Sequence, residues 1–199
     1  MARPRSISSQ DILAAAYDLL MEVGPGIFTF ERLGQKVGLV PTALIRRFKN
    51  KKQLMLAINR YALELTDKEV FNAIKTAQSP IEAIIVQFTT EMKFATTVER
   101  FANGQELLLH DLRDTDLYVS YRLTFERRHL QIVQLLVKAQ GDGLLTRIDN
   151  VNELARHLES VAHGIGHVWV TTGEYTIDEC IRRYVSLTLK PYIPNSRKD

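Results

Sequence analysis

Apolar positions recur with helical spacing along almost the whole chain. Ile12, Ala16, Leu19, Leu20 and Val23 succeed one another at steps that place them on a single face of a helix. Comparable stripes follow in later segments, and no segment alternates apolar and polar residues over a strand's length between turn signals. The pattern therefore predicts an all-α fold.

Capping residues and breaks divide this pattern into separate helices. Gly24-Pro25-Gly26 is expected to stop the first helix, Gly38 the second, and Asn103-Gly104 a later one, whereas Thr176 to Glu179 form a capping box. The expected helices cover residues 8–23, 29–37, a segment from Pro41, 50–77, 80–101, 105–112, 116–139, 151–172 and 177–190.

Residues 29–48 have the layout of a helix-turn-helix. Gly38 can supply the left-handed backbone conformation of the turn, and Gly34 lies on the face that the next helix must approach closely. Arg46 and Arg47 stay on the outside, where such a motif faces DNA. Four residues are expected to make the apolar contact between the two helices: Leu33, Val37, Leu39 and Leu44. Short helix-turn-helix pairs also occur as plain packing units.

Positive charge gathers in the N-terminal part of the chain. Residues 1–60 hold ten Lys or Arg against four Asp or Glu, whereas residues 61–199 hold sixteen against nineteen. A basic segment on a mildly acidic body is typical of a protein that meets a polyanion at one end. Charge alone leaves a solvated basic face without a partner as the alternative.

Residues 10–58 resemble the N-terminal domain of the TetR family of transcriptional regulators. The resemblance lies in the order of an Ala-rich first helix, the Gly24 end, the Thr29 cap, the Gly38 turn, and then Leu44, Phe48 and Lys51. It implies a three-helix DNA-binding domain over residues 1–50 and a helical ligand-binding and dimerisation domain over residues 51–199. It also implies a homodimer on a palindromic operator, most often a repressor released by a small-molecule effector, here unknown.

The resemblance also implies which residues contact double-stranded DNA. Thr42 and Arg46 are expected near base edges, and Ile45 offers apolar contact. Thr29, Arg47 and Lys51 are expected to hold phosphates. The N-terminal arm, with Arg3 and Arg5, either adds contacts or is a solvated tail.

The chain departs from the family pattern in its recognition helix. Ile45 and Arg47 stand where family members usually carry aromatic residues, and Val40 stands where a Ser would usually cap the helix. Ala43 has no hydroxyl either, so Thr42 carries the only one nearby. These changes bear on operator sequence and affinity, and they leave open a relative that no longer binds DNA and acts as a small-molecule or metal-binding helical protein.

The rest of the chain offers candidate residues without a motif. His110, Tyr118, Tyr121 and Phe125 can line a pocket for an apolar or amphipathic molecule, or simply form core. His163 and His167, with Glu159 one turn earlier, could share a metal, but packing at a dimer interface or a satisfied core role is favoured, so no metal site is predicted. By the resemblance, the last two helices pair with their copies in a four-helix dimer bundle.

Composition excludes several other classes of protein. The single Cys180 allows no internal disulfide and no multi-cysteine zinc site. No run approaches 18 apolar residues, and the N-terminus lacks an apolar signal segment, so we expect no membrane association and a cytoplasmic location. We find no phosphate loop, paired carboxylates or nucleophile motif, so neither an enzyme nor a cofactor is predicted.

Overall fold

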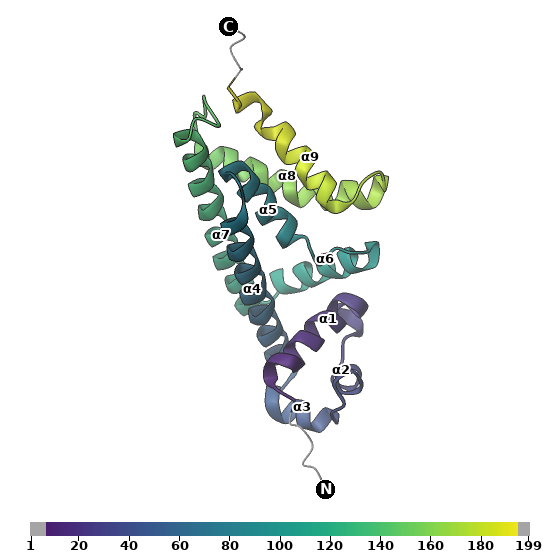
Figure 1. Cartoon of the computed structure of the whole chain (residues 1–199). Coiled ribbons are helices and arrows are strands. Elements are labelled where there is room, and N and C mark those ends of the chain that lie inside the picture. Colours follow the sequence, from purple (N-terminus) through teal and green to yellow (C-terminus); the bar gives the residue numbers. More distant parts are fainter. Residues whose placement is uncertain (1–6, 195–199) are drawn as a thin grey trace. The chain divides into compact units, whose positions relative to one another are not determined.

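The computed structural model describes residues 7–194, and every regular element in that range is a helix (Figure 1). This confirms the predicted all-α fold. The elements are α1 (Ser9–Ile27), α2 (Phe30–Val37), α3 (Pro41–Phe48), α4 (Lys51–Thr76), α5 (Pro80–Glu91), α6 (Val98–Leu112), α7 (Thr115–Gly141), α8 (Val151–Thr172), α9 (Ile177–Leu189) and the short 3-10 helix η1 (Lys190–Tyr192). Within residues 7–194, no helix has the length and apolar character that a membrane span requires.

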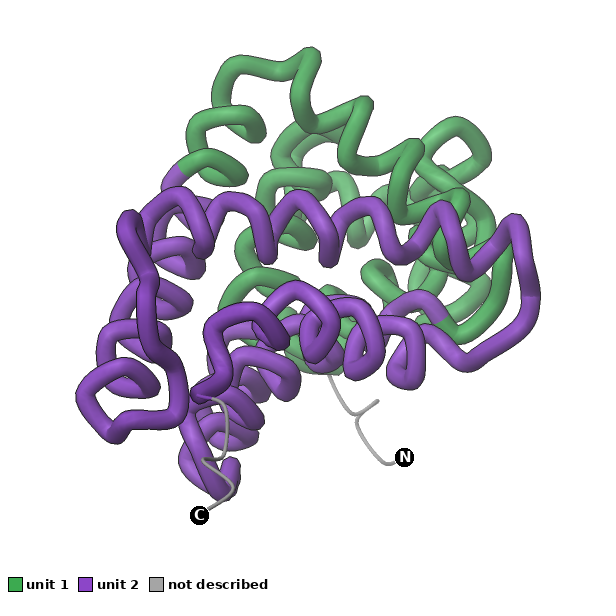
Figure 2. Tube along the Cα trace, turned by 90° about the horizontal axis from the view of Figure 1, so that it is seen from above, with its two compact units in different colours: residues 1–65, 96–122 green, residues 66–95, 123–199 purple. Residues whose placement is uncertain are grey.

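The chain forms two compact units, each assembled from segments that are distant in the sequence (Figure 2). Unit 1 contains residues 1–65 and 96–122, and unit 2 contains residues 66–95 and 123–199. The long helices α4 and α7 each contribute residues to both units. The expected domain boundary between residues 50 and 51 falls at the first residue of α4 and stays a prediction.

Side-chain caps begin several helices where the sequence places them. Each cap accepts a hydrogen bond from the backbone N–H three residues later, which satisfies a donor that the first turn leaves free. These pairs are Ser8 with Asp11, Thr29 with Arg32, Asn50 with Gln53, Ser79 with Glu82 and Thr176 with Glu179. At Thr176 the Glu179 carboxylate also accepts from the cap backbone, at 2.8 Å, so the predicted capping box is present.

The first helix runs farther than predicted because it continues across a kink. Gly24 has φ 75° and ψ 162°, a backbone region open essentially to glycine alone, and helical backbone resumes through Ile27. Phe28 N–H then donates to the Gly24 carbonyl at 3.1 Å. Gly24 thus bends the chain where the sequence predicts a stop.

The boundaries of α5 and α6 also differ from the prediction. α5 ends at Glu91 rather than near Phe101, because Thr97 begins a new helix by accepting from Arg100 N–H at 3.2 Å. Asn103 and Gly104 lie inside α6 instead of breaking the chain. The Asn103 amide donates to the Met21 carbonyl of α1 at 2.8 Å. The side chain from which the sequence predicts a turn therefore bonds to another helix instead.

Each unit has its own buried apolar interior. In unit 1, α1 packs against α2 and α6, and α2 packs against α3. In unit 2, α9 packs against both α5 and α8. The unit 2 core is continuous, and its fully buried members include Ile84, Ile132, Leu136, Leu158, Ile181 and Val185.

Candidate nucleic-acid interface

The turn between α2 and α3 has the backbone geometry that its glycine predicts. Gly38 adopts the left-handed conformation, with φ 69° and ψ 32°, and its N–H donates to the Gly34 carbonyl. Leu39 N–H donates to the same carbonyl at 2.9 Å. These two bonds close the end of α2 and set the direction in which α3 leaves.

Gly34 is required for a different reason. A Cβ at this position would lie 2.4 Å from the Leu39 carbonyl oxygen, and backbone atoms cannot yield as a flexible side chain would. The nearest atom of α3 itself, Pro41 Cδ, would be 3.7 Å away. The close approach predicted at Gly34 is therefore made first by the turn and only secondarily by the next helix.

The short helix α3 divides its residues between core and solvent. Leu44 and Phe48 are buried, as is Leu33 of α2, whereas Val37 and Leu39 are half-buried. The opposite side is exposed and carries Thr42, Ile45, Arg46 and Arg47. Four of the six predicted DNA-contacting residues thus stand on the solvent side of one rigidly packed helix.

The start of α3 has no side-chain cap. Val40 occupies the N-cap position with its side chain 64% exposed, and Pro41 follows at the first helical position. Proline suits that position because its missing N–H removes one of the donors that a cap would satisfy. This confirms the loss of the cap expected from Val40.

The three predicted phosphate-binding residues are exposed, and each also makes an internal hydrogen bond. Thr29 Oγ1 accepts from Arg32 N–H at 3.3 Å, Arg47 Nη1 donates to the Ile7 carbonyl at 3.1 Å, and Lys51 Nζ donates to the Pro25 carbonyl at 3.0 Å. Donors remain on all three, since a guanidinium has five, an ammonium three and a hydroxyl one. Arg3 and Arg5 lie outside the described residues.

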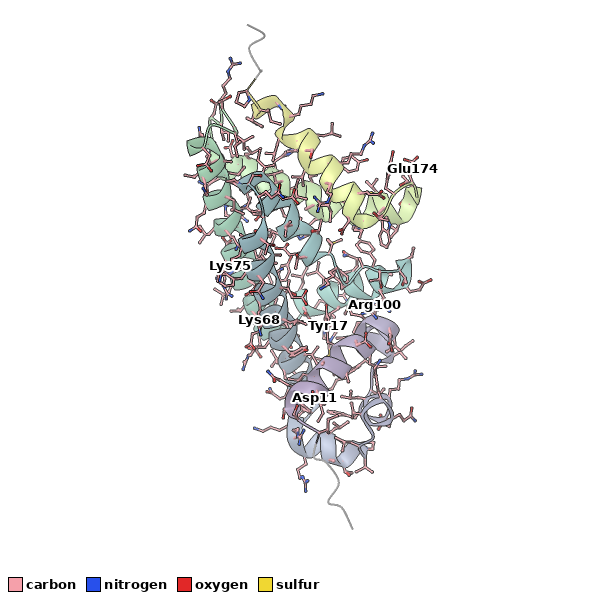
Figure 3. All side chains as sticks on the ribbon, viewed as in Figure 1. Asp11, Tyr17, Lys68, Lys75, Arg100 and Glu174 are labelled. Atoms are coloured by element: carbon pink, nitrogen blue, oxygen red, sulfur yellow. The ribbon has the colours of Figure 1, made fainter. Side chains whose placement is uncertain are left out.

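Ion pairs join the helices of unit 1 and occupy several of its basic residues. Lys36 of α2 contacts Asp18 and Glu22 of α1 at 2.9 Å, and Arg100 of α6 contacts Asp18 at 3.1 Å (Arg100 is labelled in Figure 3). The hydrogen bond from Lys36, with help from Arg100, holds the pKa of Asp18 below its usual range.

A second set of ion pairs ties α4 to the start of α7. Lys52 contacts Asp114 and Asp116 at 3.0 and 2.9 Å. Over residues 7–194, by contrast, Arg46 has no ion-pair partner. The Arg46 guanidinium on the exposed side of α3 is therefore available to an external anion.

Residues 12–58 match the family model for bacterial regulatory proteins of the tetR family. This stretch is a TetR-family helix-turn-helix domain. Regulators of this family are non-enzymatic proteins that bind DNA, typically as dimers, and respond to small-molecule effectors. No curated protein sequence matches the chain.

Solved structures of TetR-type regulators share the fold of the whole chain. A TetR transcription regulator from Haloarcula marismortui is 17% identical, with a TM-score of 0.77. The match covers 92% of this chain and 96% of that one. A putative transcriptional regulator from Saccharomonospora viridis in complex with choline is 16% identical, with a TM-score of 0.79 and the same coverage. The ketosteroid transcriptional regulator KstR2 of Mycobacterium tuberculosis is 14% identical, with a TM-score of 0.68, covering 98% of this chain and 100% of that one.

The predicted pocket residues lie in both units. His110, Tyr118 and Tyr121 belong to unit 1, where His110 and Tyr118 are exposed and Tyr121 is half-buried. Phe125 belongs to unit 2, where its ring lies 5.8 Å from that of His163. Their role in binding an effector stays a prediction.

The residues considered for a metal site are partly engaged in other contacts. His163 Nδ1 lies 2.8 Å from the Glu159 backbone carbonyl. The Glu159 carboxylate is occupied by His129, at 3.2 Å, and by Arg156, at 3.2 Å. Among the residues that the structure describes, no group of three or more His, Cys, Asp or Glu is arranged to hold a metal ion.

Sequence reasoning missed a buried polar cluster in unit 2, formed by Gln87, Glu91, Arg128, His129 and Glu159. Burial raises the pKa of Glu91, and the charge of Arg128 opposes that shift. Gln87, wholly buried, donates to Glu91 Oε1 at 3.1 Å. The one signal in the sequence is Gln87 itself, a polar residue inside an otherwise apolar stretch of α5.

Proposed function

We propose that the protein is a sequence-specific transcriptional regulator that binds a palindromic operator as a homodimer. The observation that carries this proposal is the two-sidedness of α3. Its buried residues, Leu44 and Phe48, anchor it, and its other side presents Thr42, Ile45 and Arg46 to solvent. A recognition helix needs this arrangement because base edges are read by side chains held in fixed positions.

Each exposed residue has a role that follows from its chemistry. Arg46 is suited to bidentate contact with guanine, Thr42 to a hydrogen bond with a base edge, and Ile45 to the methyl group of thymine. Thr29, Arg47 and Lys51 are assigned to phosphates, which set the register of the protein on the duplex.

Dimerisation is assigned to α8 and α9. Val168 and Leu187 are exposed apolar residues on these helices, and a Cβ at Gly164 would meet no other atom within 4 Å in the protomer. An open, partly apolar surface of this kind supports pairing with a second copy. Two recognition helices in such a dimer would reach half-sites about 34 to 36 Å apart, or a multiple of it.

We assign to the protein the role of a repressor that a small molecule releases from its operator. A ligand that binds better to the state unable to reach both half-sites lowers DNA affinity by that difference. His110, Tyr118, Tyr121 and Phe125 are the proposed pocket residues. Support comes from two structures of similar fold whose names include a small molecule. One is in complex with choline, and the other is a ketosteroid transcriptional regulator.

The deciding experiment is selection of bound sequences from a random duplex pool at two salt concentrations. Enrichment of a palindrome, with affinity that falls steeply as salt rises, supports a dimeric regulator. A monomeric protein, or no enrichment at either concentration, would instead favour a helical relative that has lost DNA binding.

Variants of adjacent arginines separate base reading from phosphate contact. We expect Arg46→Ala to lose about tenfold or more in operator affinity and to relax specificity at one base pair. Arg47→Ala should weaken binding to all duplexes alike and reduce the salt slope by about one. Arg122→Ala, at an exposed position on α7, is the matched control and should leave affinity unchanged.

A further inference from the structure

A hollow of about 420 Å³ lies in unit 2, between the second half of α4 and the middle of α7. Its lining combines four kinds of side chain. Two are apolar, two are guanidinium groups, two are amides and one is a carboxylate: Phe71, Leu130, Arg127, Arg128, Gln131, Gln134 and Asp67. Small-molecule sites typically pair an apolar wall with a few polar groups of this kind.

Arg128 is held near carboxylates without being hydrogen-bonded to them. Its Nη2 lies 3.6 Å from Asp67 Oδ1 on α4, and its Nε lies 3.7 Å from Glu91 Oε1 on α5. The Nε atom is buried and has no hydrogen-bond partner among the described residues. A buried donor left in this state costs free energy, so a closer acceptor would be favourable.

Arg127 competes with Arg128 for the same internal carboxylate. Arg127 Nη1 donates to Asp67 Oδ2 at 2.5 Å, while its side chain remains 68% exposed. Asp67 at the rim of the hollow thus faces two guanidinium groups, and Arg128 also lies beside the Glu91 carboxylate without a hydrogen bond to it. An external carboxylate could accept two parallel hydrogen bonds from one guanidinium.

The apolar wall of the hollow is exposed, with the Lys75 ammonium 4.0 Å from the centre of the Phe71 ring, and the amides are unused. Phe71 and Leu130 are 55% and 57% exposed. The side-chain amides of Gln131 and Gln134 have no hydrogen-bond partner over residues 7–194. Hydrocarbon on the ligand would cover the first pair, and a polar substituent would meet the second.

We propose that this hollow binds a small amphipathic carboxylate. The carboxylate accepts from Arg128, with Arg127 beside it, and the hydrocarbon part lies on Phe71 and Leu130. An inorganic anion would leave the apolar wall uncovered, and a neutral hydrocarbon would offer the guanidinium groups no additional acceptor. The site involves none of the residues assigned to DNA or to the effector pocket, and its occupancy does not depend on operator binding.

The test is titration calorimetry of the full chain at low ionic strength with four probes. Benzoate and heptanoate carry both features of the proposed ligand, benzyl alcohol carries only the apolar part, and inorganic phosphate only the charge. We expect both carboxylates to bind at least about tenfold more tightly than the other two probes. Equal binding of phosphate would overturn the proposal, as would no binding of either carboxylate at millimolar concentration.

Variants connect binding to the residues. Arg128→Gln should weaken benzoate binding by about tenfold or more, because a charge-assisted hydrogen bond is lost. Phe71→Ala should weaken it by about three- to tenfold through the loss of ring contact. The matched control, Arg122→Gln, removes an exposed arginine of the same helix away from the hollow and should bind benzoate as the native chain does.

Two further observations keep the proposal open to refutation. Arg128→Gln leaves Glu91 without its cation and can impair folding, whereas Phe71 is exposed and its removal should not. Unchanged benzoate affinity in folded Phe71→Ala protein therefore overturns the proposal by itself. NMR shifts on adding benzoate should appear at the Leu130 methyl groups and the side-chain amides of Gln131 and Gln134, and shifts confined to other residues would contradict the site.

Discussion

The helix-turn-helix and the middle of α7 use polar side chains in opposite ways. In the former, the hydrogen bonds that cap the helices and close the turn join residues only a few positions apart, as in the Thr29 cap, and Arg46 faces solvent without an ion-pair partner among the described residues. In the latter, the successive residues Arg128 and His129 meet carboxylates from different helices, Glu91 of α5 and Glu159 of α8. The cap and turn geometry of the first region is determined by local sequence, whereas the contacts of the second are determined by tertiary packing.

The largest effect is expected at the tightest point of the local region. Gly34→Ala would place a Cβ 2.4 Å from the Leu39 carbonyl oxygen, so the turn must move. We expect a loss of about 3 kcal/mol in the free energy of unfolding, measured by denaturant titration, with loss of duplex binding. Gly38→Ala is the control, because a Cβ there meets nothing within 4 Å and only the positive φ is penalised, by about 1 kcal/mol. Equal losses in the two variants would show that backbone conformation, not contact, limits the turn.

The matching experiment in the tertiary region removes a buried acceptor. Glu159→Ala leaves His129 buried without its carboxylate and deprives Arg156 of one partner. We expect a loss of about 2 kcal/mol by denaturant titration, because a buried polar group is left unpaired. Glu126→Ala is a matched control, since Glu126 also accepts from Arg156 at 3.2 Å but is exposed, and a change below about 0.5 kcal/mol is expected. A similar loss in both variants would mean that burial of Glu159 has no special effect.

The contrast between the two regions explains what sequence could predict. The caps at Thr29 and Thr176 and the left-handed Gly38 depend on neighbours within a few residues, and the structure confirms them. The break predicted at Asn103 is wrong, because its amide donates to the carbonyl of Met21, a residue 82 positions away, and nothing in the local sequence indicates that contact.

The polar cluster of unit 2 could not be predicted for the same reason. Arg128 and His129 are adjacent in the sequence, yet their partners come from two other helices. Periodicity identifies which face of a helix is apolar, but it does not say which residue of another helix will stand opposite a given position. The proposed DNA-contacting residues are different. The family resemblance assigns them to positions in a helix-turn-helix whose geometry depends on neighbouring residues, and their exposure supports that assignment.

A stabilising change is expected at the start of α3, where the helix has no side-chain cap. Val40→Ser would supply a side-chain acceptor at the start of α3, where the native chain has no cap. We expect a gain of about 0.5 to 1 kcal/mol in the free energy of unfolding. Val40→Ala removes the exposed apolar side chain without adding a cap and should give no such gain. A gain from both variants would point to the loss of Val40 itself as the cause.

The smallest effect is expected where the local region is tied to a distant helix by exposed charges. Asp18 meets Lys36 and Arg100, and its folded-state pKa lies below the unfolded value. An acid of this kind stabilises the fold above its unfolded pKa, and that contribution is lost as pH falls through the folded pKa.

Because Asp18 is 49% exposed, solvent screening limits its contribution, and Asp18→Asn should lose about 0.5 kcal/mol at pH 7. The difference from the native chain should shrink as the pH is lowered below about 4 in a series of denaturant titrations. Glu31→Gln, at an exposed position without an ion pair among the described residues, is the control and should show no comparable pH dependence. If the loss in the free energy of unfolding persists unchanged at low pH, the effect of Asp18 comes from packing rather than from its charge. The contact would then resemble those of the buried polar cluster in unit 2.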